Sequence, residues 1–205
     1  MRIDGRRLRS ARTKQLIVEA YLALLRESPE IPTAAMIAER AGYSVRSVFE
    51  RFQDLHALRV AATDYAFTQG TAQAVPREVM GDRASRIRSH VETRSWICEE
   101  WLPLWRALVS NQGDSVELKA RIAQVRQAVL RRIELMYDEE LSVLADVERR
   151  QTVLAIDSLV DFESWGRMRD VSGLSIEEAR QVWIVSIDRL LPPTPARPGQ
   201  KRAVS

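Results

Sequence analysis

The sequence predicts an all-α fold, and three features support this prediction. Apolar residues recur three or four positions apart in several long segments, which is the spacing of one helix face. No segment of useful length alternates apolar and polar residues, as a half-buried strand would. Short polar residues, glycines and prolines stand between the apolar segments, where helices begin and end. A chain of 205 residues is long enough for one or two domains with a substantial core.

The first apolar segment predicts a helix over residues 10–27, ended by the serine and prolines that follow it. Its inward face consists of Ile17, Tyr21, Leu24 and Leu25. Basic residues gather at its start. Within residues 1–14 they are Arg2, Arg6, Arg7, Arg9, Arg12 and Lys14. Such an arm could attract phosphate or enter a minor groove, and a solvated terminus without specific contacts is the alternative.

The stretch that follows predicts two short helices joined by a tight turn. Thr33 is placed to cap a helix over Ala34–Ala41, and Gly42 is able to end it with a positive φ. Ser44 is placed to cap a second helix, Val45–Phe52. This is the helix-turn-helix arrangement, in which the second helix enters a major groove of DNA.

The second of these helices has two different faces. Val48 and Phe52 are four residues apart and form its apolar side. Arg46, Ser47 and Arg51 lie on the opposite side. We therefore expect the polar side to face outward, where it can contact a partner.

The remaining apolar segments predict further helices. Asp54 is placed to cap a helix over residues 55–69, and Asp114 or Ser115 to cap another that runs to residue 141. Ser175 and Glu178 form a capping-box pattern. The other expected helices cover residues 82–98, a tryptophan-rich run to 111 with Pro103 at its start or at a kink, 147–168 and 175–191.

The block from Thr33 to Leu58 resembles the DNA-binding signature of the TetR family of bacterial transcriptional regulators. The matching positions are Thr33, Ile37, Ala38, Ala41, Gly42, Ser44, Phe52 and Leu58. Ser47 and Val48 stand where the family has threonine and leucine. Three other positions depart further: Phe49 replaces tyrosine, Arg51 replaces tyrosine or histidine, and Leu55 replaces a lysine. The family's tyrosine hydroxyl and lysine contact phosphates, so these departures affect expected DNA contacts.

The resemblance and the chemistry of groove readout together give a set of expected DNA contacts. Arg46 is the first candidate for a base contact, because its guanidinium can bond two acceptors of guanine. Val45 could touch a thymine methyl group, and Phe49 could pack on the DNA backbone. The expected DNA-binding residues are Thr33, Ser44, Val45, Arg46, Ser47, Phe49 and Arg51.

The resemblance also implies a domain organisation. Residues 1–54 would form the DNA-binding domain, residues 55–191 a helical effector-binding and dimerisation domain, and residues 192–205 a disordered tail. Apolar residues on more than one face of the last two helices favour a homodimer. The implied effector is an unknown small, largely apolar molecule. Its candidate contacts are Trp96, Trp101, Trp105 and Trp165, and an ordinary core role for these tryptophans is the alternative.

Several classes of function are not favoured. A single cysteine, Cys98, permits no internal disulfide and fits a reducing compartment, and no segment is apolar enough for a signal peptide or membrane span. His56 and His90 have no metal-ligand spacing, and no phosphate-binding loop or nucleophile motif is present. We expect a cytoplasmic protein that is not an enzyme and uses no cofactor or metal.

Two functional hypotheses remain. The first is a dimeric regulator that binds a palindromic operator on double-stranded DNA and represses nearby genes until a ligand releases it. The second is a helical interaction protein whose N-terminal bundle binds protein instead of DNA, which the departures at Phe49 and Leu55 would favour. A steep salt dependence of DNA binding would distinguish the first from the second.

Overall fold

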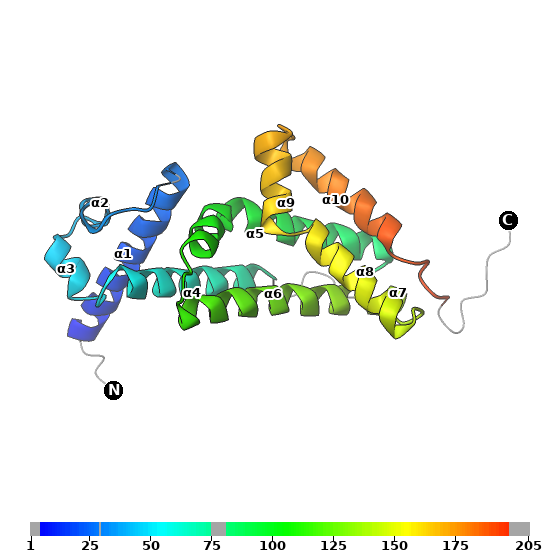
Figure 1. Cartoon of the computed structure of the whole chain (residues 1–205), viewed down its shortest axis with the longest axis horizontal. Coiled ribbons are helices and arrows are strands. Elements are labelled where there is room, and N and C mark those ends of the chain that lie inside the picture. Colours follow the sequence, from blue (N-terminus) through cyan, green and yellow to red (C-terminus); the bar gives the residue numbers. More distant parts are fainter. Residues whose placement is uncertain (1–4, 29, 75–80, 197–205) are drawn as a thin grey trace. The chain divides into compact units, whose positions relative to one another are not determined.

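The computed structural model describes residues 5–28, 30–74 and 81–196, and every regular element in these ranges is a helix (Figure 1). The predicted all-α fold class is confirmed. The chain divides into two compact units: residues 1–73 with 100–125, and residues 74–99 with 126–205. The long helices α5 (Arg83–Ser110) and α6 (Val116–Met136) each contribute one part to each unit. The functional boundary after residue 54 stays a prediction.

The first unit begins with three helices that lie together at the N-terminal end of the chain (Figure 1): α1 (Gly5–Glu27), α2 (Ala34–Ala41) and α3 (Val45–Phe49). Helix α4 (Leu55–Ala74) follows. The predicted apolar positions form the core, since Ile17, Tyr21, Ile37, Val48 and Leu58 are almost completely inaccessible to solvent. This burial raises the pKa of Tyr21 to about 12.

A second apolar cluster in the first unit joins α4 to the adjoining parts of α5 and α6. Its members are Val60, Trp105, Leu108, Val109, Leu118 and Ile122. An ion pair ties the same helices at the surface, with Nε of Arg121 2.9 Å from a carboxylate oxygen of Asp64. The α4 helix is therefore fixed on both its apolar and its polar side.

The second unit contains the beginning of α5, the end of α6 and the C-terminal helices. These are α7 (Asp138–Leu141), α8 (Asp146–Leu159), α9 (Phe162–Gly166), the π-helical turn η1 (Arg167–Val171) and α10 (Ile176–Leu190). Trp165 and Trp183 are fully buried, with ring centroids 4.9 Å apart and planes tilted by 53°. This tilted pair joins α9 to α10 in the core.

The predicted helix caps form. The Thr33 hydroxyl accepts from the backbone N–H of Met36, and a carboxylate oxygen of Asp54 accepts from the N–H of Ala57. Ser115, one of two predicted alternatives, accepts from the N–H of Leu118. Ser175 and Glu178 form the predicted capping box. Local polar residues therefore set where these helices begin.

Several predicted helix ends were wrong. Helix α1 begins at Gly5 and not at residue 10, and α4 continues to Ala74, beyond residue 69. Neither extension contains a proline, so nothing in the chain ended these helices at the expected place. Helix α3 ends at Phe49 and not at Phe52, but the following turn keeps Phe52 buried because its N–H bonds to the carbonyl of Val48.

Three further predictions about where a helix is interrupted were wrong. Helix α5 is continuous from residue 83 to 110, with Pro103 inside it. The helix predicted to reach residue 141 ends at Met136, because Tyr137 leaves helical geometry, with φ −120° and ψ 22°, and its side chain is buried. The helix predicted over residues 147–168 breaks at Val160, and Asp161 caps a new helix by accepting from the N–H of Ser164 at 2.6 Å.

Part of the predicted tail, residues 197–205, lies outside the described residues, as do residues 1–4 of the basic arm. Within the described ranges, no helix is both long enough and apolar enough to cross a bilayer.

Candidate functional site

The turn between α2 and α3 has the geometry that the sequence predicts. Gly42 adopts φ +73° and ψ 31°, in the left-handed region that favours glycine. Its N–H donates to the carbonyl of Glu39, and the N–H of Tyr43 donates to the carbonyl of Ala38 at 2.9 Å. These bonds end α2 and turn the chain directly into α3.

Helix α3 separates an inner from an outer face. Val48 and the following Phe52 are buried, at 0% and 4% exposure, and hold the helix against the unit. Val45 and Phe49 remain 41% and 45% exposed, and the side chain of Arg46 is 88% exposed. The outer face thus presents one long cation between two apolar side chains, a combination suited to the major groove.

Short hydroxyl groups cap the two helices of the turn. The Ser44 hydroxyl oxygen accepts from the N–H of Ser47 at 3.1 Å, and the two hydroxyl oxygens lie 2.9 Å apart. The Thr33 hydroxyl oxygen likewise accepts from a backbone N–H. A capping hydroxyl keeps its own proton, so Thr33 can still donate to a phosphate, and the Ser44–Ser47 pair retains one such proton.

Glu50 is a feature of this face that sequence reasoning missed. Its carboxylate lies 3.1 Å from Nε of Arg46 and 3.9 Å from Nη1 of Arg51. The spacing of Arg46 and its C-cap residue Glu50, four residues apart, could have indicated the pair. Glu50 holds the Arg46 side chain along the outer face, and a carboxylate is also an acceptor for the amino group of cytosine.

The other residues considered as DNA contacts are less exposed than Arg46. Arg51 is 31% exposed, and its Nε is buried without a hydrogen-bond partner among the described residues. His56 lies 3.4 Å from the Ser115 hydroxyl and 3.8 Å from the Glu117 carboxylate, so a phosphate would have to compete with that carboxylate. Leu55, where the resemblance expects lysine, starts α4.

Helix α1 adds cations near this site. The ammonium group of Lys14 lies 5.3 Å from the ring centroid of Phe52, and Arg9 and Arg12 are exposed. The Thr13 hydroxyl lies 3.4 Å from the hydroxyl of Tyr43, which brings α1 to the turn. The remaining predicted arm residues are either outside the described residues or, for Arg6 and Arg7, have side chains that are not described.

The four tryptophans predicted to contact an effector differ in environment. Trp101 is buried beneath the guanidinium of Arg26, at 5.3 Å, and Trp105 packs in the apolar cluster of the first unit. Trp96 is 36% exposed, whereas Trp165 is fully buried and its indole N–H donates to Glu99 at 2.6 Å. Trp96 and Trp165 belong to the second unit, and the other two to the first. Their role in ligand binding stays a prediction.

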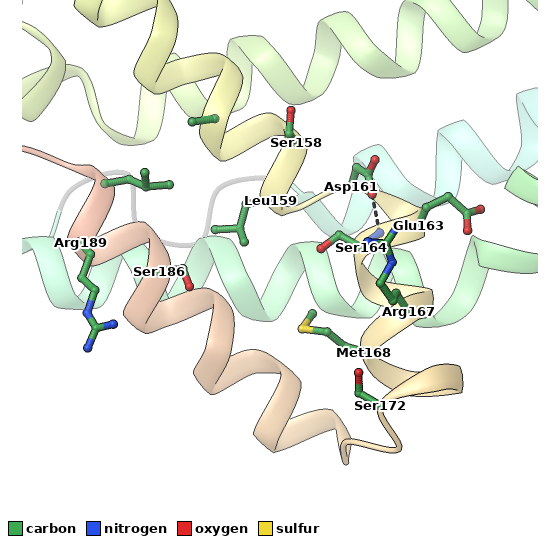
Figure 2. Close-up of a pocket in the computed structure, with 12 residues that line it drawn as sticks. Ser158, Leu159, Asp161, Glu163, Ser164, Arg167, Met168, Ser172, Ser186 and Arg189 are labelled. Atoms are coloured by element: carbon green, nitrogen blue, oxygen red, sulfur yellow. Dashed lines mark hydrogen bonds between the residues drawn. The ribbon is translucent and has the colours of Figure 1, made fainter.

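The second unit has an open groove of about 690 Å³ between α8, the α9–η1 segment and α10 (Figure 2). Figure 2 shows Ser158, Arg167 and Arg189 around it, with apolar side chains such as Met168 between them. None of the four tryptophans is among its lining residues. The groove is lined by both polar and apolar residues, and it lies between the helices predicted to dimerise.

Within the second unit, α8 and α10 also expose apolar residues beyond the core. Val182, Val185 and Leu190 lie on the outward side of α10 and are 37–42% exposed, and Leu154 of α8 is 45% exposed. The buried residues Trp183 and Ile187 occupy the other side of α10. Both faces of α10 are therefore apolar, as the sequence indicated.

Comparison with known proteins identifies the fold. No protein-family model and no curated sequence matches the chain. A TetR-family transcriptional regulator from Streptomyces coelicolor has a TM-score of 0.73 at 21% identity, covering 88% of this chain and 80% of that chain. A Rhodococcus protein assigned to the same family has a TM-score of 0.66 at 20% identity, covering 89% of this chain and 100% of its own.

A transcriptional regulator from Rhodococcus sp. Rha1 has a TM-score of 0.71 at 16% identity, covering 89% of this chain and 99% of that chain. At these identities the likeness concerns the fold. The chain has the fold of TetR-family regulators, as the sequence resemblance implied.

Proposed function

We propose that this protein is a TetR-like transcriptional regulator that binds double-stranded DNA through α2 and α3. The observation that carries the proposal is the outer face of α3. There Arg46 is 88% exposed while its neighbour Val48 is fully buried, so the helix is held firmly with its cation outward. The fold, which is that of TetR-family regulators, supports the same function.

Arg46 supplies the base contact in this proposal. Its guanidinium exchanges the exposed carboxylate of Glu50 for the acceptors of guanine, at little cost because the exposed pair is weak. Val45 lies beside it, exposed and able to contact a thymine methyl group. Glu50, released from Arg46, is then placed to accept from a cytosine.

Phosphate contacts compensate for the departures at Phe49 and Leu55. The Thr33 hydroxyl and the Ser44–Ser47 pair each keep one proton to donate, and Arg51 is partly exposed shortly after α3. Phe49 presents an exposed ring that can pack on sugar and backbone. Cations of α1 add electrostatic attraction that does not depend on sequence.

We propose a homodimer that uses α8 and α10. The exposed Val182 and Val185 form an apolar strip on the outer side of α10, which a second copy would bury. A two-fold dimer would place two copies of α3 on the half-sites of a palindromic operator. In the same proposal, the protein represses nearby genes and a small effector bound in the helical domain releases it by favouring the state that does not bind DNA.

The test is selection of bound sequences from a random double-stranded DNA pool at moderate salt, using the full chain. Enrichment of a palindrome, with affinity that falls steeply as salt rises, is the expected result. Recovery of unenriched DNA, or of none, would contradict sequence-specific binding and favour the alternative in which the N-terminal bundle binds protein.

The variant Arg46→Gln tests the base contact itself. Its matched control is Arg131→Gln, because Arg131 is an exposed arginine of the second unit. The first variant should lose roughly 1–3 kcal/mol of binding free energy and relax specificity at one base position. Equal weakening on all sequences would make Arg46 a phosphate contact. Sedimentation of Val182→Lys, compared with wild type, tests the dimer interface in the same experiment series.

A further inference from the structure

Tyr43, the residue of the turn between α2 and α3, has a fixed backbone and an exposed side chain. It follows Gly42, which has a positive φ, and its N–H donates to the carbonyl of Ala38 at 2.9 Å. Its side chain is nevertheless 36% exposed, although it is a large aromatic group. An aromatic ring with a polar tip, held at the surface by a rigid turn, is well suited to contact a partner.

The hydroxyl proton of Tyr43 is available to such a partner. Within the described ranges this hydroxyl has one hydrogen-bond contact, with the hydroxyl of Thr13 on α1, and the two oxygens are 3.4 Å apart. Thr13 has a single proton, which it can donate either to Tyr43 or to the carbonyl of Arg9 at 3.0 Å. In the first case the Tyr43 proton is free, and in the second it is held only by a contact that is long for two hydroxyls.

The part of α1 that contacts Tyr43 is strongly basic. Residues 5–18 contain five basic side chains and no acidic one. Arg9 and Arg12 are exposed, and neither forms an ion pair with another residue that the structure describes. Arg9 precedes Thr13 by four positions, so the two lie on the same side of the helix. The donor hydroxyl of Tyr43 therefore lies beside uncompensated positive charge, which attracts an anion.

This junction of α1 and the turn adjoins both ends of α3. Tyr43 immediately precedes Ser44, the N-cap residue of α3. Beyond the other end of α3, the ring of Phe52 lies 5.3 Å from the ammonium group of Lys14, the neighbour of Thr13 on α1. A major groove is about 12 Å wide and is bordered by a phosphate backbone on each side. Residues that flank a helix inserted in the groove therefore meet phosphates.

We propose that the Tyr43 hydroxyl donates a hydrogen bond to a phosphate of the DNA backbone, beside the cations of α1. The inference rests on the proposed DNA-binding function, to which it adds a contact from the turn. A hydrogen bond to a charged phosphate oxygen is stronger than the long contact with Thr13 that it replaces. Tyr43 is thus a positioning residue, which fixes the placement of α3 in the groove without reading a base.

The test measures the affinity of variants of the full chain for the palindrome enriched by selection and for a scrambled duplex of the same length. Tyr43→Phe removes the hydroxyl and keeps the ring. Tyr65→Phe is the matched control, because it removes a hydroxyl from α4 in the same unit. Arg9→Gln removes one of the exposed cations of α1. Each affinity is measured at several salt concentrations.

Tyr43→Phe should bind both duplexes about tenfold more weakly than wild type, because a dimer loses one phosphate contact in each half-site. Its base preferences should not change, and Tyr65→Phe should bind as wild type does. The slope of log affinity against log salt should be unchanged in Tyr43→Phe, which loses no charge. In Arg9→Gln the slope should fall by about 1 for each subunit.

Unchanged affinity of Tyr43→Phe would overturn the proposal, and so would a loss confined to one base position, which would make Tyr43 a base contact. The urea midpoint of Tyr43→Phe should equal that of wild type, because the contact with Thr13 is long and exposed. A lowered midpoint would show that the hydroxyl serves the fold, which also overturns the proposal. Enrichment of a palindrome with full affinity of Tyr43→Phe would contradict this inference alone, whereas a wild type that binds no DNA would contradict the proposed function and this inference together.

Discussion

The two units of this chain differ in what they bury. In the first unit, Thr63 is the one polar residue that is buried among those described, whereas the second buries three charged residues together with histidine and serines. An apolar interior makes the first unit a rigid support for side chains on its surface. The polar interior of the second unit is costly unless its groups are paired, so the stability of this unit depends on those pairs.

The difference between the interiors of the two units is tested most strongly by one ion pair from each unit. Arg86→Met removes one partner of a pair in which Glu140 is 0% exposed, and should cost about 3–5 kcal/mol of unfolding free energy. Arg121→Met breaks the partly exposed pair with Asp64 and should cost roughly 0.2–1 kcal/mol. Urea unfolding measures both. Similar losses for the two variants would contradict the proposed difference between the interiors.

The apolar interior of the first unit is tested by two neighbouring residues of α2. Ile37 is 0% exposed, so Ile37→Ala should cost about 2–5 kcal/mol through lost burial and the cavity that remains. Met36 is exposed, and Met36→Ala should change stability by less than about 0.5 kcal/mol. Thermal and urea unfolding check this contrast. An equal effect of both substitutions would mean that α2 does not pack as the structure describes.

The pH dependence of stability should come partly from His90 in the second unit. Its pKa is about 3 in the folded chain, below the usual value of 6.5, so between these values the unfolded state binds the additional proton. The contribution of His90 to the free energy of unfolding is fully present above pH 6.5. It is lost as pH falls towards 3, by up to about 1.4 kcal/mol per pH unit.

His90→Gln is the variant that isolates this effect, because glutamine can still accept from the Tyr137 hydroxyl and does not titrate. Urea unfolding at several pH values between 6 and 4 should show a smaller slope for His90→Gln than for wild type. Parallel curves for the two proteins would show that His90 gains its proton without any cost in the folded state.

Features determined by neighbouring residues were predicted well from the sequence. The caps at Thr33, Ser44 and Ser175 and the turn at Gly42 each depend on contacts within a few positions, and all of them form. The apolar spacing of α3 likewise placed Val48 inward. These local rules were sufficient for the fold class and for the outer face of the candidate DNA-binding helix.

Features that depend on distant contacts were missed. Tyr137 breaks the expected long helix and bonds to His90, 47 positions earlier in the chain. The break at Val160 frees a carbonyl that accepts from Arg94, 66 positions earlier. Arginine on a helix is ordinarily a surface residue, so nothing in the sequence indicated that Arg94 lies in the interior, where it is 6% exposed.

The smallest expected effect concerns the turn that carries the DNA-binding face. Gly42 has φ +73° and no atom within 4 Å of an added Cβ, so Gly42→Ala should destabilise the first unit through backbone conformation alone, by roughly 1–2 kcal/mol. Gly70 is also unobstructed but lies inside α4, where Gly70→Ala should stabilise by about 0.4–1 kcal/mol. Opposite signs in urea unfolding would show that Gly42 is required by its positive φ, while a gain in both variants would mean that the turn relaxes readily and does not hold α3 rigidly on the first unit.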